Sequence, residues 1–100
     1  MLRPLPSLGG VPSYLVETYL PRGAAGERER RERRARSAAA ELTRSGTRVS
    51  FDRSIHVPED ELCFFVVDAP TSRDAALLAE RAALEPLRVV EAISSGEEKR

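Results

Sequence analysis

The sequence predicts one small α+β domain with the element order βαββαβ, in which a four-stranded antiparallel sheet carries two helices on one face. Three observations indicate this class. Segments rich in β-branched and aromatic residues alternate with two segments that repeat small apolar residues at helical spacing. Proline or glycine separates most of these segments. A chain of 100 residues has the length of a single domain.

The first two elements are predicted at residues 14–20 and 27–45. The first is rich in β-forming side chains and lies between two prolines, which is typical of a strand. The second contains four apolar residues at the i, i+3, i+4 and i+7 positions of a helix: Ala35, Ala38, Ala39 and Leu42. Their small side chains predict close packing of the helix on the sheet, and Gly46 suits the left-handed position that ends many helices.

A hairpin is predicted from the next two apolar segments. Residues 47–57 alternate, with Val49, Phe51, Ile55 and Val57 on one face and Ser50, Asp52, Ser54 and His56 on the other. This alternation predicts a half-buried strand. Residues 58–61 form the expected turn, and residues 62–69 are a nearly continuous apolar strand.

The last helix and strand repeat the same pattern. Thr71 with Asp74 resembles a capping box at the start of a helix whose apolar stripe follows: Ala75, Leu78, Ala79 and Ala82. Pro86 ends this helix, and residues 87–93 are the last strand. The complete order is that of the ferredoxin-like fold. It occupies residues 13–93, between a Pro/Gly-rich leader at 1–12 and a polar tail at 94–100.

Composition excludes several classes of protein. The formal net charge of zero argues against a nucleic-acid binder that relies on a general positive field. No apolar run is long enough to span a bilayer, and the leader does not resemble a signal peptide, so a cytoplasmic protein without a membrane partner is expected. Residues 27–36 carry nine charges, which we interpret as a solvated helix start with pairs at i, i+4: Glu27–Arg31, Glu29–Arg33 and Glu32–Arg36.

The third strand predicts a homodimer. Leu62, Phe64 and Val66 occupy one of its faces, and Cys63, Phe65 and Val67 occupy the other. Because both helices cover one face of the sheet, the second face needs a separate cover. We assign Cys63, Phe65 and Val67 to this open face and expect a second copy to bury it. The alternative is that the leader folds over it.

Four short segments resemble a known family in their order and spacing: residues 14–17, residues 53–60, residues 68–70 and residues 88–91. The chain resembles a bacterial ferredoxin-like domain-of-unknown-function family, numbered forty-two forty-two, which includes nickel-binding members. The resemblance implies the fold and a homodimer. The cysteine and histidine that such members use fall at Phe65 and Ala79 here, so those nickel ligands do not carry over.

His56 and Cys63 form the candidate metal site. A hairpin centred on residues 59 and 60 places them directly opposite each other, with side chains on one face of the sheet. Imidazole and thiolate bind nickel, copper or zinc well. Asp52 could supply a third ligand, and Ser54, Asp60 or groups from a partner are further candidates to complete the site. The alternative is a histidine near a turn beside a buried structural cysteine. A nucleophile–base pair is less expected, because no glycine lies where an oxyanion hole would be needed.

These observations lead to two hypotheses about function. The first is a small non-enzymatic dimeric binding domain, whose ligand, a transition metal such as nickel or a small molecule, lies at the open sheet face. The alternative is a dimeric α/β-barrel enzyme of the cofactor-independent oxygenase or isomerase type. Glu17 and Glu91 could be acid/base groups if they converge on that face, but we interpret them first as charges at the rim of the sheet. A purely structural or regulatory dimer is a third hypothesis. RNA binding is not expected, because the third strand lacks the required glycine and basic residues.

Overall fold

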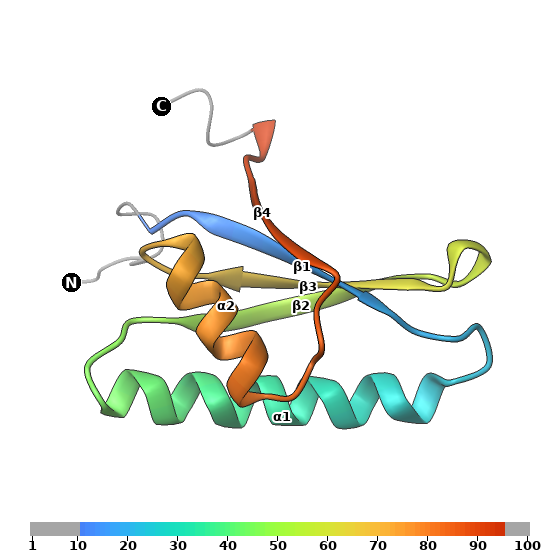
Figure 1. Cartoon of the computed structure of the whole chain (residues 1–100), viewed down its shortest axis with the longest axis horizontal. Helices are drawn as coiled ribbons and strands as arrows, with labels where there is room; N and C mark the ends of the chain where they lie inside the picture. The colour runs from blue at the N-terminus through green and yellow to red at the C-terminus, as the bar shows by residue number, and fades with distance from the viewer. Residues whose placement is uncertain (1–10, 96–100) are drawn as a thin grey trace.

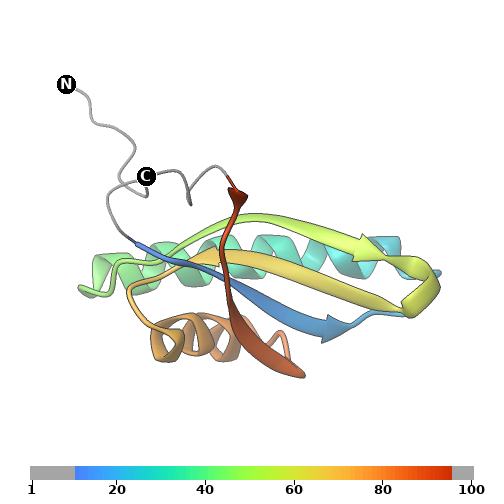
Figure 2. The same cartoon turned by 90° about the horizontal axis from the view of Figure 1, so that it is seen from above.

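The computed structural model describes residues 11–95, and its elements follow the predicted order. They are β1 (Ser13–Tyr19), α1 (Ala25–Arg44), β2 (Ser50–Val57), the 3-10 turn η2 (Pro58–Asp60), β3 (Leu62–Asp68), α2 (Ser72–Arg81) and β4 (Arg88–Ala92). The strands form one antiparallel sheet in the order β2-β3-β1-β4, and both helices lie on one side of it (Figures 1 and 2). The ferredoxin-like fold is therefore confirmed. Most of the leader and of the polar tail, residues 1–10 and 96–100, lies outside the described residues.

Local sequence signals end α1 and begin α2. Gly46 adopts a φ of 107°, and its N–H donates to the carbonyl of Thr43 while the N–H of Thr47 donates to that of Leu42. These two bonds form a Schellman motif, which satisfies carbonyls that the helix end would leave unpaired. At the start of α2 the Thr71 hydroxyl accepts from the N–H of Asp74 at 3.1 Å. Both predicted helix boundaries are confirmed.

A β-bulge in β2 changes which side chains face the helices. Phe51 pairs with Val67 and Arg53 pairs with Val66, so Asp52 is the extra residue. Beyond the bulge, Ser54 and His56 share the helix side, whereas Ile55 and Val57 lie on the open face. The predicted uniform alternation of this strand is wrong, because one inserted residue exchanges the two faces.

The core lies between the sheet and the two helices. The buried apolar stripes of α1 and α2 pack on the inward side chains of β1 and β3, and α2 contributes Ala75, Leu78 and Ala79. The small side chains let the helices approach the sheet closely, as predicted. The ring of Phe51 lies 5.9 Å from that of Phe65, which extends the core toward the β2 edge.

The two faces of β3 are the reverse of those predicted. Cys63, Phe65 and Val67 are fully buried in the core beneath the helices. The open face is instead occupied by the alternate residues Leu62 and Phe64, with Val66 beside them. The assignment of Cys63, Phe65 and Val67 as the dimer face is therefore wrong. Both faces of β3 are apolar, so its own sequence pattern carries no information about which face the helices cover.

Candidate functional site

Cys63 and His56 are cross-strand partners, as predicted, and Thr18 flanks Cys63 on its other side. The three residues form a row across β1, β3 and β2 on the helix side of the sheet. The thiol is fully buried, and its burial raises the pKa of Cys63. The Nε2 atom of His56 is also buried and has no hydrogen-bond partner within the described residues. The predicted site thus faces α1 rather than open solvent.

Asp52 does not join this pair. It occupies the β-bulge, and its carboxylate binds the neighbouring Arg53, with 2.5 Å between Oδ2 and Nη1. Within residues 11–95 no group of three His, Cys, Asp or Glu side chains is placed to hold a metal ion. The structure therefore assembles two of the three predicted ligands. The bulge displaces Asp52, because the prediction assumed uninterrupted alternation between Asp52 and His56.

A polar layer lies beside Cys63 on the helix side of the sheet. We use this name for Arg28, Arg31 and Glu32 of α1 together with Thr18 of β1 and Ser54 of β2. The Ser54 hydroxyl accepts from Arg28 Nε at 2.9 Å and donates to the carboxylate of Glu32. Arg28 also donates to the carbonyl of Ser54 at 3.2 Å. Ser54 is largely buried, and its hydroxyl has both a donor and an acceptor partner in this layer.

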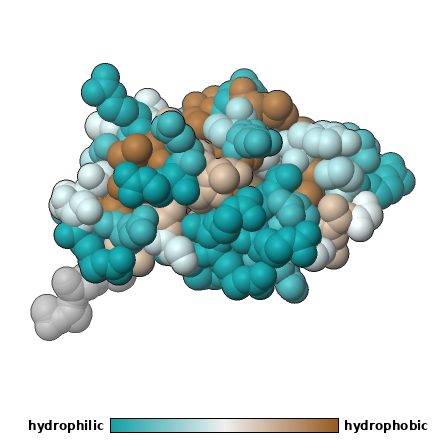
Figure 3. Space-filling model, turned by 60° about the horizontal axis from the view of Figure 1, so that its bottom comes forward, coloured by the Kyte–Doolittle hydropathy of each residue, from teal (hydrophilic) through white to brown (hydrophobic). Residues whose placement is uncertain are grey.

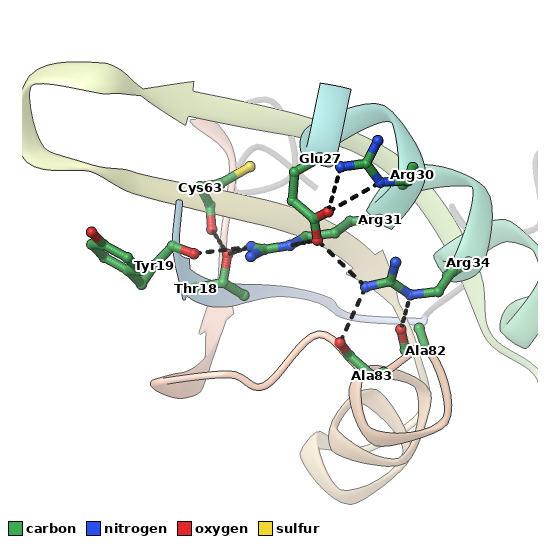
Figure 4. Close-up of polar contacts among 9 residues, drawn as sticks. All are labelled: Thr18, Tyr19, Glu27, Arg30, Arg31, Arg34, Cys63, Ala82 and Ala83. Atoms are coloured by element: carbon green, nitrogen blue, oxygen red, sulfur yellow. Dashed lines mark hydrogen bonds and ion pairs between the residues drawn. The ribbon is translucent and has the colours of Figure 1, made fainter. Parts of the chain in front are cut away.

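Thr18 links the layer to the backbone of Cys63. Its hydroxyl donates to the Cys63 carbonyl at 2.8 Å and accepts from Arg31 Nη1 at 3.3 Å (Figure 4). The same nitrogen of Arg31 donates to the carbonyl of Tyr19 at 3.0 Å. Arg28, Arg31 and Glu32 all act electrostatically on the Cys63 thiol, where the arginines lower its pKa by less than burial raises it. The thiol therefore stays protonated at neutral pH.

Glu27 and Arg34 make further polar contacts in the first half of α1. Glu27 accepts from Arg31 Nε at 2.9 Å, and this hydrogen bond holds the pKa of Glu27 below its ordinary value against a smaller opposing effect of desolvation (Figure 4). A lowered pKa means that the pair stabilises the fold at neutral pH and loses that contribution as acid protonates Glu27. Arg34 donates to the carbonyls of Ala82 and Ala83, which follow α2.

The polar layer was not predicted from the sequence. The pair Glu27–Arg31 forms as expected, but Glu32 binds Ser54 and Arg28, and the Arg36 guanidinium lies 5.1 Å from the centre of the Phe51 ring. The spacing of these charged residues along α1 was the signal that could have revealed the polar layer. Positions 28, 31 and 32 continue the stripe of Ala35, Ala38, Ala39 and Leu42 toward the helix start, so they share its inward face.

The open face of the sheet is the second candidate surface. Its side chains are predominantly apolar, and two of them are prominently exposed, Tyr19 at 54% and Ile55 at 42%. The cross-strand register places them in rows with other outward residues: Leu15, Val57, Leu62, Phe64, Val66 and Val90. In one row Glu17 binds Arg88, with 2.7 Å between Oε1 and Nε. Exposed apolar patches are a frequent feature of association sites, so this face is a candidate for one.

Glu17 and Glu91 do not converge. Glu17 stands opposite Arg88 on the open face, whereas Glu91 stands opposite Tyr14, which faces the core. Side chains alternate between the two faces along a strand, so Arg88 and Glu91 lie on opposite faces of β4. The carboxylates of Glu17 and Glu91 are therefore on opposite faces of the sheet. Within the described sheet the two carboxylates do not meet as an acid/base pair would require.

The helix side carries shallow grooves among the described residues. With the α1 side turned forward, the surface is mostly hydrophilic and is interrupted by smaller hydrophobic patches (Figure 3). One groove between α1 and α2 is lined in part by Arg33, Arg34, Glu41 and Arg81, and in it Arg81 Nη1 lies 3.4 Å from Glu41 Oε1. Within the described part of the chain, neither helix is long and apolar enough to cross a membrane.

Comparisons with protein-family models, curated proteins and solved structures give no match. The family resemblance and its nickel-binding branch therefore remain predictions. The candidate sites rest on the geometry described above.

Proposed function

We propose that the chain is a small non-enzymatic binding domain that associates with a second copy through the open face of its sheet. The observation that carries the proposal is the apolar character of that face. Burying an exposed Phe, Leu, Ile or Val side chain contributes up to about 1.5–3 kcal/mol. Tyr19, Ile55 and Phe64 offer such area, and the two helices cover the opposite face.

The Glu17–Arg88 ion pair favours a second copy as the partner. The Glu17 side chain is only 17% exposed and the Arg88 side chain is 68% exposed, so the pair presents a positive residue beside apolar side chains. Two copies related by a two-fold axis bring the same surface together, and each Arg88 can then approach the Glu17 of its partner. Opposite charges inside an apolar contact set its register, because an unpaired charge would be costly to desolvate.

The oligomeric state tests this proposal. Sedimentation or light scattering across a range of concentrations should give twice the chain mass of 11.0 kDa for the wild type. Phe64→Glu places a carboxylate opposite Glu17 and should raise the dimer dissociation constant by about 100-fold or more, because that charge would be desolvated without a partner. Its circular dichroism should match that of the wild type.

The control is Leu87→Glu, which adds the same charge at a residue that is 59% exposed and lies before β4. It should leave the dimer intact. A wild type that stays monomeric at every concentration, or a Phe64→Glu variant that dimerises normally, would contradict the proposal.

A dimeric α/β-barrel enzyme is the alternative, and the position of Glu17 favours it. A carboxylate in the middle of an apolar sheet face could act as an acid or base if two such faces enclosed a chamber. A structure of the dimer separates the two: a dry sheet–sheet contact excludes the enzyme, and a chamber that contains Glu17 supports it.

Transition-metal binding stays a separate prediction. The cross-strand pairing of His56 with Cys63 supports it. Titration of Ni²⁺ or Zn²⁺ into the wild type and into His56→Ala tests it by calorimetry. Stoichiometric binding that the variant loses would establish a site at this pair, whereas equal heats from both proteins, or none, would exclude it.

A further inference from the structure

The two halves of α1 are held against the sheet by different forces. The second half buries the whole apolar stripe: Ala35, Ala38, Ala39 and Leu42. Residues 25–34 bury no side chain completely. This half contacts the strands through Arg28, Arg31 and Glu32, and it contacts the segment after α2 through Arg34. Its docking therefore depends largely on hydrogen bonds and ion pairs.

Salt acts differently on the two halves. The charged side chains of the polar layer are partly open to water, with Arg28 at 37% and Arg31 at 15% exposure. Interactions between such groups are weak, and dissolved ions screen them. Burial of the apolar stripe depends on the area removed from water and is not screened. A higher ionic strength should therefore loosen residues 25–34 while the second half of α1 remains docked.

The sequence around the helix start adds to this difference. Gly23 lies just before α1 and Gly26 lies in its first turn, and glycine favours the unfolded chain over a helix. A side chain at position 26 would meet only the flexible end of Arg30, so no close packing requires the glycine there. The backbone of the first turn is thus weakened, and its apolar contact with the core comes from Ala24 just before the helix.

We propose that residues 25–34 form a salt-sensitive lid, which leaves the sheet while the rest of the domain stays folded and so controls access to Cys63 and His56. Regions with few buried apolar contacts open locally, at a lower free energy than global unfolding. With the lid closed, Cys63 is fully buried beneath the polar layer. With the lid open, the thiol and the buried Nε2 atom of His56 become reachable together. The lid lies on the helix side, so the proposal is independent of the dimer.

Thiol labelling tests the lid in the full-length protein. Cys63 is the single cysteine of the chain, so the rate of its alkylation by neutral iodoacetamide, followed by mass spectrometry, reports its exposure. Raising NaCl from about 0.01 M to about 1 M shortens the Debye length from about 30 Å to about 3 Å. We expect labelling to become about tenfold faster over this range, relative to glutathione at the same salt concentration, because the docking contacts are screened.

Two matched arginine variants locate the effect. Arg31→Ala removes the contacts with Thr18, Tyr19 and Glu27, and should label about tenfold faster than the wild type at low salt, with a smaller response to NaCl. Arg33→Ala makes the same change on the exposed surface of the same helix. It should label within about twofold of the wild type.

The urea dependence distinguishes the lid from global unfolding. Local opening exposes less surface, so labelling should rise less steeply with urea than the unfolding constant measured by circular dichroism. A labelling rate with the full urea dependence of global unfolding would overturn the proposal. So would a rate that does not respond to NaCl, or equal rates for Arg31→Ala and Arg33→Ala. The NaCl and urea dependence of labelling in the wild type tests the lid even if Arg31→Ala does not fold.

Discussion

Replacing Phe65 by alanine is expected to lower the free energy of unfolding by about 3–5 kcal/mol, the usual cost of removing a buried aromatic ring. Phe65 is fully buried between the sheet and the helices, and its ring contacts that of Phe51. Because a domain of this size is stable by only about 5–15 kcal/mol, the loss should be visible as a large fall in the urea midpoint at unchanged slope.

Phe64 provides the matched comparison. Phe64 directly precedes Phe65 in β3 and points to the open face. Phe64→Ala should therefore lower the free energy of unfolding of the monomer by only about 1 kcal/mol. Unfolding should be measured at several protein concentrations, since association stabilises the native state by mass action. Equal losses for the two variants, or a larger loss for Phe64→Ala, would show that the faces of β3 are assigned incorrectly.

Replacing Leu42 by alanine is expected to cost about 2–5 kcal/mol. Leu42 is the largest apolar side chain in the buried stripe of α1 and is only 3% exposed. The alanines beside it are too small to fill the resulting cavity, so the second half of the helix should lose much of its attachment to the sheet. Chemical denaturation followed by circular dichroism measures this loss.

Leu87→Ala makes the identical chemical change at an exposed position and should alter stability by no more than about 0.5 kcal/mol. The comparison also bears on the lid. If the apolar half of α1 is its anchor, Leu42→Ala should accelerate labelling of Cys63 through global unfolding, with the full urea dependence. If Leu42→Ala costs no more than Leu87→Ala, the apolar stripe does not hold the helix.

Much of the fold could be predicted, because its signals are local. Gly46 ends α1 in the left-handed region, the Thr71 hydroxyl caps α2, and the hairpin register that pairs His56 with Cys63 follows from the length of its turn. The stripes of α1 and α2 also predicted which helix residues are buried. Each of these features is set by residues that lie within one turn or one hairpin of each other.

The candidate site could be predicted only in part. The pairing of His56 with Cys63 followed from the hairpin, but the bulge at Asp52 had no signature in the alternating pattern and removed the third ligand. The arginines of α1 suggested a solvated surface because arginine is usually exposed. Their place on the inward stripe outweighs this tendency, since long side chains can pack along a surface while their charged ends reach hydroxyls and carbonyls.

The sequence by itself therefore determined the order of elements, the end of α1, the start of α2, the hairpin register and the presence of apolar side chains on both faces of β3. It did not give the end of α2, which stops at Arg81, before the predicted break at Pro86. Only the tertiary structure decided which face the helices cover. Because both faces of β3 are apolar, either face could pack against the helices. Which face they cover depends on the direction in which the connections before and after the helices pass over the sheet. That choice buries Phe65 and Cys63, leaves Phe64 outward, and places the open face and the lid on opposite sides of the molecule.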